Sequence, residues 1–310
     1  MGDKVTPKKV VFFHAITPVH MGAGQGLDHI DLPIQREQHT KFPIFYASGI
    51  KGALRQLALE IAKEKCKGYS LTEINNLVEN SECPKEEQNS ERNEKQDCEK
   101  AIETLVKIFG SQDCKGSLTI SDAKILFFSV KSLKGVFAYV TCPYVLNRYG
   151  EDTGKGKIFD SEIAEGKIFA SETLKVEGSK AVLEEFEFEN IGEPKEVIEK
   201  LNLPEDLKNK ISQRVAIVSD DIFSYFVENL TEVVNRIKID PETGTVDKKT
   251  GGLWTEEYLP AESVLYSLWF ENEDLNSAEE NYLPSDGSLL ILGGDQTVGK
   301  GIVKLYEGEV

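Results

Sequence analysis

Short runs of β-branched and aromatic residues recur along the chain, and each ends at glycine, proline or polar turn residues. Such runs are typical of buried strands. Between them lie stretches whose apolar positions follow a helical spacing, which predicts amphipathic helices. Strands are expected at residues 10–17, 116–128, 135–142, 264–271 and at both ends of 289–307, and helices at 53–64, 101–110, 195–204 and 219–230.

The order of these elements predicts an α+β fold, because strands and helices do not alternate as they do in a doubly wound sheet. Residues at about 67–100 are polar and hold few large apolar groups, and those at about 146–200 are of mixed character, so both are expected to be insertions. Residues 236–258 have a strand, turn, strand pattern, with DPETG as the turn and a glycine pair as a bend, and they predict a β-hairpin.

The composition is that of a globular protein. With 310 residues, of which 40% are hydrophobic and 29% charged, the chain can bury a substantial core. No apolar run approaches the roughly 18 residues that span a bilayer, and the N-terminus lacks the apolar segment of a secretory signal. We therefore expect a cytoplasmic protein with no membrane partner.

The net charge of −17 argues against a free nucleic-acid-binding protein, which usually carries a basic surface. The charges are unevenly distributed, however, because residues 1–55 hold seven Lys and Arg against four Asp and Glu. A basic site on an acidic body suits a subunit that meets RNA on one face, although an acidic surface needs no function to explain it.

The chain has five cysteines, and four of them, Cys66, Cys83, Cys98 and Cys114, are spaced fairly evenly without a CxxC pair or a nearby histidine. The spacing argues against a zinc site. An odd number of cysteines in a chain without a secretory signal argues against a disulfide framework. We expect reduced, partly buried thiols.

Residues 10–55 contain all four histidines of the chain and a loop punctuated by three glycines. Asp31 follows this loop, at a position where aspartate is common as a turn residue. His20 ends the first strand, where it could hydrogen-bond the backbone or act as an acid or base near neutral pH. Lys51 lies at the start of a helix, where a cation opposes the helix dipole, so its presence is easier to explain if an anion binds there.

Four segments together resemble the RAMP superfamily: TPVHMGAGQGLDHIDLPIQREQHTKFP, GIKGALR, LWTEEYLP and GGDQTVGKGIVKL. Within it, the likeness is to the repeated backbone subunit of the type III-B (Cmr) CRISPR effector complex. The likeness runs from the first strand to the last, and the DLPIQRE block is far more specific than a lone glycine motif. It implies one RAMP domain over residues 1–310, with a ferredoxin-like, RRM-like core, large insertions and a protruding thumb hairpin at 236–258.

The resemblance also implies an activity. Asp31 corresponds to the aspartate on which cleavage of target RNA depends. Glu256 and Tyr258, with Glu257 as an alternative, correspond to groups near the cleavage site, although on residue pattern alone they could be an exposed hairpin edge. His20 would serve beside them as an acid, a base or a positioning group. A divalent ion, Mg²⁺ or Mn²⁺, would be held by Asp31 and mostly by RNA phosphate.

Binding of the RNA backbone is expected at Lys51 and Arg55, and at the glycine-rich loop of Gly299, Lys300 and Gly301, where main chain can approach phosphate closely. The same loop could be a plain turn between two strands. It lacks the GxxxxGK[ST] arrangement, so no nucleotide cofactor is expected.

The implied partners are CRISPR guide RNA, target RNA, further copies of the chain in a helical backbone and other Cmr subunits. Guide bases would select the target, which the chain would cut at regular intervals as a metal-dependent endoribonuclease in antiviral defence. Two alternatives stay open: a non-catalytic scaffold that holds guide RNA, and an endoribonuclease that processes guide RNA.

Overall fold

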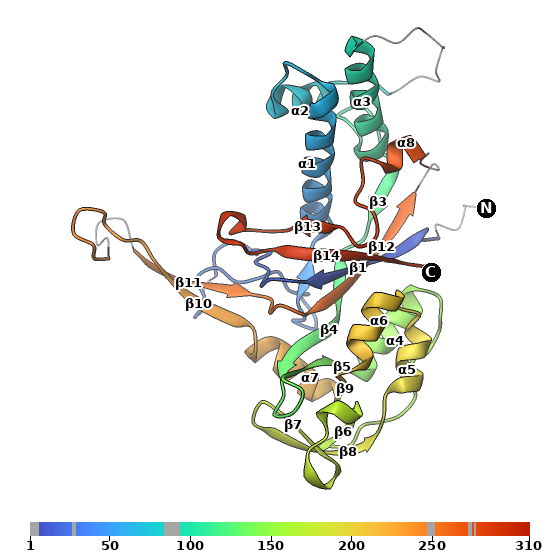
Figure 1. Ribbon diagram of the computed structural model, residues 1–310, viewed down its shortest axis with the longest axis vertical. Coiled ribbons are helices and arrows are strands. Elements are labelled where there is room, and N and C mark those ends of the chain that lie inside the picture. Colours follow the sequence, from blue (N-terminus) through green and yellow to red (C-terminus); the bar gives the residue numbers. More distant parts are fainter. Residues whose placement is uncertain (1–5, 27–28, 84–93, 247–251, 272–274, 276) are drawn as a thin grey trace.

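The computed structural model describes residues 6–26, 29–83, 94–246, 252–271, 275 and 277–310. It confirms the predicted mixture of strands and helices: a large mixed sheet, a separate two-stranded hairpin and two groups of helices (Figure 1). The ferredoxin-like arrangement of the core stays a prediction. Residues 84–93 of the first expected insertion and 247–251 of the expected hairpin lie outside the described residues.

The strands are β1 (Lys9–Ala15), β2 (Ile44–Phe45), β3 (Leu118–Ile120), β4 (Ala123–Lys131), β5 (Phe137–Thr141), β6 (Lys167–Ala170), β7 (Lys180–Leu183), β8 (Phe186–Gly192), β9 (Val215–Ile217), β10 (Glu232–Ile237), β11 (Leu253–Tyr258), β12 (Val264–Glu271), β13 (Leu289–Ile291) and β14 (Ile302–Gly308). The large sheet has the order β13-β14-β1-β12-β4-β5-β9-β6-β8-β7, with β2 paired to β4 and β3 to β12. Two of its pairs, β5 with β9 and β6 with β8, are parallel.

The helices are α1 (Ala47–Lys65), α2 (Leu71–Glu79), α3 (Glu94–Phe109), α4 (Pro143–Asp152), α5 (Lys195–Leu201), α6 (Glu205–Ser212), α7 (Asp220–Asn229) and α8 (Ser277–Glu280), with short 3₁₀ turns η1 (Glu172–Leu174), η2 (Glu177–Ser179) and η3 (Gln296–Val298). Among the described residues, no helix has both the length and the apolar character that crossing a membrane requires.

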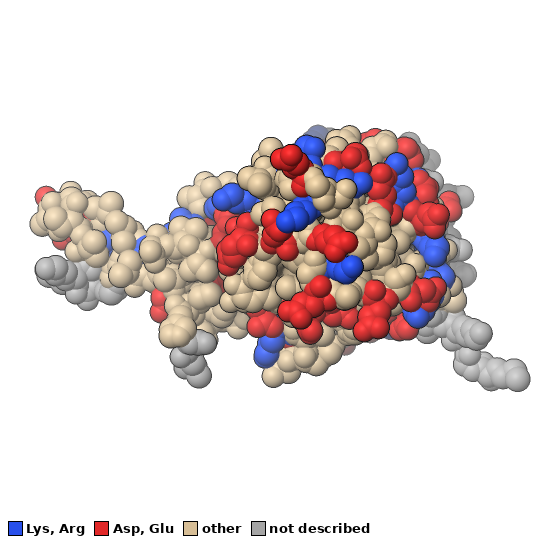
Figure 2. All heavy atoms as spheres, turned by 90° about the horizontal axis from the view of Figure 1, so that it is seen from below, with Lys and Arg blue, Asp and Glu red and all other residues tan. Residues whose placement is uncertain are grey.

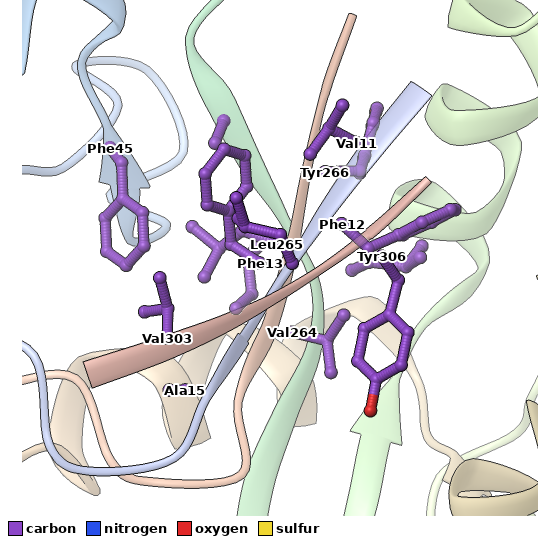
Figure 3. Packing of buried hydrophobic residues seen from close by; sticks show 14 of the residues in the cluster. Val11, Phe12, Phe13, Ala15, Phe45, Val264, Leu265, Tyr266, Val303 and Tyr306 are labelled. Atoms are coloured by element: carbon purple, nitrogen blue, oxygen red, sulfur yellow. The ribbon is translucent and has the colours of Figure 1, made fainter. Parts of the chain in front are cut away.

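The core is built around β1, which lies between β14 and β12 and is antiparallel to both. Phe12 stands opposite Tyr306 on one side and Tyr266 on the other. β1 is buried from its second residue to its last, and its aromatic and β-branched side chains suit a pleated surface covered on both faces. Figure 3 shows side chains of these three strands packed together around Phe12 and Phe13.

The helices α1, α2 and α3 stand together beyond one side of the sheet (Figure 1). The expectation of reduced thiols is wrong for four of the five cysteines, because Cys66 is joined to Cys98 and Cys83 to Cys114. Their Cα atoms are 4.6 and 5.1 Å apart, within the usual range for a disulfide. Packing of the three helices brings together cysteines whose even spacing along the chain gave no sign of pairing.

The helices α4 to α7 lie around the opposite part of the sheet, which ends in β6, β7 and β8 (Figure 1). Figure 2 shows this end of the molecule, where Asp and Glu side chains spread over the surface with Lys and Arg among them. The acidic side chains seen on this face are therefore solvated surface.

The hairpin of β10 and β11 projects away from the sheet (Figure 1). The two strands pair antiparallel, from Glu232 opposite Tyr258 to Ile237 opposite Leu253. Beyond its base the hairpin exposes apolar side chains, with Ile237 50% and Leu253 67% exposed. The hairpin thus presents apolar side chains to solvent, and its base meets the segment that contains Asp31.

Candidate functional site

The segment after the first loop runs beside the hairpin. The N–H of Leu32 donates to the carbonyl of Thr255 at 3.0 Å, and the N–H of Glu257 donates to the carbonyl of Leu32 at 3.0 Å. This parallel bridge places residues 31–34 against β11. Two parts of the predicted site that are 224 residues apart in the chain are thereby in contact.

Asp31 lies exposed at the start of this segment. Its Oδ2 accepts hydrogen bonds from the N–H and from the hydroxyl of Thr255, both at 2.8 Å. These bonds lower the pKa of Asp31 below the usual range for aspartate. The bond from the N–H contributes most, and the bond from the hydroxyl comes next. Asp31 therefore presents a fixed, ionised carboxylate to solvent at neutral pH.

The two neighbouring glutamates of β11 have different surroundings, because successive residues of a strand face opposite sides. Glu257 is 2% exposed. Its carboxylate accepts hydrogen bonds from the N–H of Ile34 at 2.9 Å, the guanidinium of Arg36 at 2.6 Å and the hydroxyl of Thr231 at 2.8 Å. Glu257 thus joins the Asp31 segment to the base of the hairpin.

Glu256 and Tyr258 belong to a second cluster. The phenolic oxygen of Tyr258 lies 2.5 Å from a carboxylate oxygen of Glu256, 2.5 Å from one of Asp295 and 2.5 Å from Nη2 of Arg236. The indole N–H of Trp254 also donates to Glu256, at 2.7 Å. The hairpin and the C-terminal glycine-rich loop therefore meet at one phenol.

This cluster fixes two protonation states. Burial raises the pKa of Glu256, but hydrogen bonds, the largest from Trp254 and Tyr258, outweigh burial and lower the pKa to about 2. Burial is also the first cause of a raised pKa at Tyr258, followed by its hydrogen bonds to Asp295 and Glu256. At neutral pH an ionised glutamate therefore lies beside a phenol that keeps its proton.

His20 faces Tyr258, with their ring centroids 5.5 Å apart. Its Nδ1 lies 2.7 Å from the carbonyl oxygen of Glu257. Because a carbonyl only accepts, Nδ1 carries the proton, and Nε2 of the neutral ring is an acceptor. A Cβ at position 22 would lie 2.8 Å from Nε2, so a larger residue than Gly22 would press against that nitrogen.

Known proteins can now be compared with this arrangement. The sequence profile of the RAMP superfamily matches residues 12–304. The chain belongs to the RAMP superfamily. This RAMP protein is 37% identical over 321 residues to the CRISPR system Cmr endoribonuclease Cmr4 of Pyrococcus furiosus, and the match covers 97% of this chain and 96% of the relative. It is 25% identical over 333 residues to the CRISPR system CMR subunit Cmr4 of Saccharolobus solfataricus, with 96% and 95% covered.

Solved structures of Cmr4 and of a Cmr complex have folds similar to that of this chain. Oligomeric Cmr4 from Pyrococcus furiosus has a TM-score of 0.66 at 29% identity, over 98% of this RAMP protein and 99% of that chain. A chain of the type III-B Cmr-beta complex bound to cognate target RNA has a TM-score of 0.67 at 24% identity, over 96% of both chains. At that identity the second likeness shows the fold alone.

The RNA-binding residues predicted for this RAMP protein lie in two places. Lys300 belongs to the glycine-rich loop, and its Nζ lies 4.9 Å from the centre of the Tyr258 ring. Lys51 and Arg55 lie on α1 instead. Nζ of Lys51 donates to the carbonyl of Leu118 at 2.9 Å, and burial, followed by the charge of Arg55, lowers its pKa. Binding of RNA by these residues stays a prediction.

The flanking glycines of the same loop differ in their surroundings. The N–H of Gly301 donates to the carbonyl of Pro18 at 2.9 Å, which attaches the loop to the segment that follows β1. Gly299 has a φ of +78°, and a Cβ there would meet nothing within 4 Å. Contact of either glycine with RNA phosphate also stays a prediction.

The part of the chain that the structure describes contains no group of three or more His, Cys, Asp or Glu side chains arranged to hold a metal ion. Asp31 is exposed, and both hydrogen bonds that it accepts go to Oδ2. Such a carboxylate fits an ion that takes most of its ligands from phosphate and water. Metal binding by Asp31 stays a prediction.

Three residues of the site were not predicted from the sequence: Thr255, Arg236 and Asp295. Asp295 stands among glycines in GGDQTVGKG, and a carboxylate in a loop already singled out was a usable signal. Thr255 and Arg236 gave none, because only the pairing of the hairpin with distant segments brings them to the site.

Proposed function

We propose that this RAMP protein is the RNA-cleaving backbone subunit of a type III-B CRISPR effector complex. It binds guide RNA in the cytoplasm, together with further copies of itself and other Cmr subunits, and it cuts target RNA that pairs with the guide. The observation that carries the proposal is an exposed, ionised Asp31 fixed against a hairpin that also holds His20, Glu256 and Tyr258. Full-length similarity to a protein named a Cmr endoribonuclease supports it.

The proposed reaction is attack of a ribose 2′-hydroxyl on the adjacent phosphate. A bond forms between the 2′-oxygen and phosphorus, the bond from phosphorus to the 5′-oxygen breaks, and the products carry a 2′,3′-cyclic phosphate and a 5′-hydroxyl. The proton of the 2′-hydroxyl goes to a base, and the departing 5′-oxygen takes up a proton. In-line attack needs a geometry that A-form RNA does not offer, so the RNA must be distorted.

The residues divide this work. Asp31 takes the proton of the 2′-hydroxyl or binds a divalent ion, and a bound Mg²⁺ or Mn²⁺ would reduce the negative charge of the phosphate. The acceptor Nε2 of His20 can accept a proton or, once protonated, return it. Tyr258 is a positioning group whose ring faces His20, and the ionised Glu256 holds the phenol and its neighbours in place.

The hairpin and two basic regions bind the RNA in this proposal. The hairpin inserts between bases and distorts the duplex, which its exposed apolar residues Val233, Ile237 and Leu253 favour. Lys51 and Arg55 on α1, with the glycine-rich loop at 299–301, contact the backbone of the guide. Base pairing, and not the protein, then supplies sequence specificity.

Cleavage of a labelled RNA complementary to the guide tests the proposal. The complex is reconstituted with the unaltered chain or with Asp31→Asn, with and without Mg²⁺. We expect evenly spaced products from the unaltered complex, and no products with Asp31→Asn or without the metal. Size-exclusion chromatography checks that Asp31→Asn still assembles with guide RNA, as an exposed isosteric change should allow.

Each other result supports a different function. Unchanged cutting by Asp31→Asn would move the active site elsewhere. No cutting by the unaltered complex would leave a scaffold that holds guide RNA. Cleavage of precursor guide RNA by the isolated chain without metal would indicate a processing endoribonuclease.

A further inference from the structure

Arg236 and Asp295 meet at the hydroxyl of Tyr258, although one comes from β10 and the other from the glycine-rich loop. Arg236 contacts Glu256 from Nε at 2.9 Å, Tyr258 from Nη2 at 2.5 Å and Asp295 from Nη2 at 3.2 Å. The Tyr258 hydroxyl lies 2.5 Å from Asp295. A single guanidinium therefore connects both carboxylates with the phenol.

The Tyr258 hydroxyl has one proton to donate and lies between two carboxylates. It accepts a hydrogen bond from Arg236, so its own proton points to Asp295 or to Glu256 at any one time. The Tyr258 side chain is fully buried, whereas those of Arg236 and Asp295 are 27% exposed. The orientation of the buried phenol is thus set by two residues nearer the surface.

The backbone of the glycine-rich loop fixes the position of Asp295. The N–H of Gly294 donates to the carbonyl of His20 at 2.9 Å. A Cβ on Gly293 would lie 2.1 Å from the same oxygen, so only glycine lets the loop come this close. Asp295 itself has a φ of +58°, in the left-handed region that few residues other than glycine adopt. The loop therefore carries the Asp295 carboxylate to the phenol from a backbone anchored on the site histidine.

The pair of carboxylates is not arranged as a cation site, because the guanidinium of Arg236 contacts both Glu256 and Asp295. Among the described residues, His20 and Lys300 also face the phenol. With a cation already supplied by Arg236, the two carboxylates act on the hydroxyl of Tyr258 instead of on a metal ion.

We propose that Arg236 and Asp295 are positioning residues for RNA cleavage, and that they act through the hydroxyl of Tyr258. Together they hold this hydroxyl, and with it the buried ring that faces His20, in the position that cleavage requires. The proposal rests on the proposed function, because its main readout is cleavage of target RNA. It assigns a role to the aspartate of the glycine-rich loop that is distinct from the binding of phosphate by the same loop.

A double-mutant cycle tests this role. Single-turnover rate constants are measured for complexes with Asp295→Ala, Arg236→Ala and Tyr258→Phe, and with Tyr258→Phe combined with each of the other two. We expect Asp295→Ala and Arg236→Ala each to slow cleavage by about ten- to a hundredfold, the loss of a hydrogen bond to a charged group. In the Tyr258→Phe background the same changes should cause almost no further loss, since the hydroxyl through which they act is absent.

Matched variants control the experiment. The carboxylate of Asp286 lies outside the cluster and accepts a hydrogen bond from the main-chain N–H of Glu307 at 2.9 Å, so Asp286→Ala should leave the rate unchanged. Asp295→Asn keeps one acceptor oxygen and should recover part of the rate. Denaturation midpoints identify any variant whose loss comes from unfolding.

The outcomes separate the two proposals. Losses that multiply in the double variants, or single variants with normal rates, overturn the positioning role while the proposed function stands. Absence of cleavage by the unaltered complex overturns both, because no reaction remains for these residues to serve.

Discussion

Replacement of Glu257 by alanine should destabilise the protein strongly, although its neighbour Glu256 is the glutamate placed in the reaction. The change removes a buried carboxylate that accepts hydrogen bonds from Ile34, Arg36 and Thr231. Loss of one partner from a buried ion pair costs about 3–5 kcal/mol, because the other charge is left unpaired. A neutral hydrogen bond contributes only about 0.5–1.5 kcal/mol.

The lower end of that range is expected, because Arg36 keeps other acceptors. Its Nη1 still donates to the carbonyls of Lys41 at 2.7 Å and Val227 at 2.9 Å, and its side chain is 18% exposed. We therefore expect Glu257→Ala to lower the free energy of unfolding by about 3 kcal/mol. That is a large fraction of the roughly 5–15 kcal/mol that stabilises a typical protein.

Equilibrium denaturation in guanidinium chloride, followed by circular dichroism, measures this loss. Glu193→Ala is the matched control, since Glu193 pairs with a Lys195 side chain that is 83% exposed and surface ion pairs contribute little. A midpoint for Glu257→Ala no lower than that of the control would refute the structural role of Glu257. Its carboxylate would then have to be reconsidered as a reacting group.

Three further changes should have measurable effects. Cys66→Ser with Cys98→Ser opens a link between residues 32 apart and should lower the free energy of unfolding by about 3–4 kcal/mol, as comparison with the oxidised protein would show. The hydrogen bond from His14 is the first cause that lowers the pKa of Glu262 from 4.5 to about 2. The stabilisation that the ionised Glu262 contributes is therefore complete above pH 4.5 and is lost as the pH falls toward 2. Midpoints measured across that range should converge for the protein and Glu262→Gln, and a constant difference would contradict the assignment. Gly293→Ala should lower the midpoint more than Gly299→Ala, because both have a φ of +78° but only the first Cβ meets main chain, at 2.1 Å; equal losses would count against the close approach.

The sequence predicted those parts of the fold that depend on local pattern. The apolar run of β1 is such a feature, since the burial of a strand depends largely on its own residues. The cysteine prediction failed because pairing depends on how three helices pack, which even spacing along the chain does not reveal.

The site likewise has features that the sequence predicted and features that depend on contacts between distant residues. The loop that precedes Asp31 and the LWTEEYLP segment stood out in the sequence, but the different surroundings of Glu256 and Glu257 did not. These depend on which side of β11 receives the segment from Asp31 to Arg36, a contact between distant parts of the chain. Asp295 was missed as a site residue for the same reason, since its partners lie on the hairpin.

The contact between β11 and the Asp31 segment has a mechanical consequence. Thr255 and Glu257 of this strand contact that segment, and Glu256 and Tyr258 of the same strand belong to the phenol cluster. Both parts of the site are therefore attached to the hairpin. A displacement of the hairpin would therefore reach Asp31 and Tyr258 together. Contact of RNA with the hairpin and alignment of the reacting groups would then be coupled.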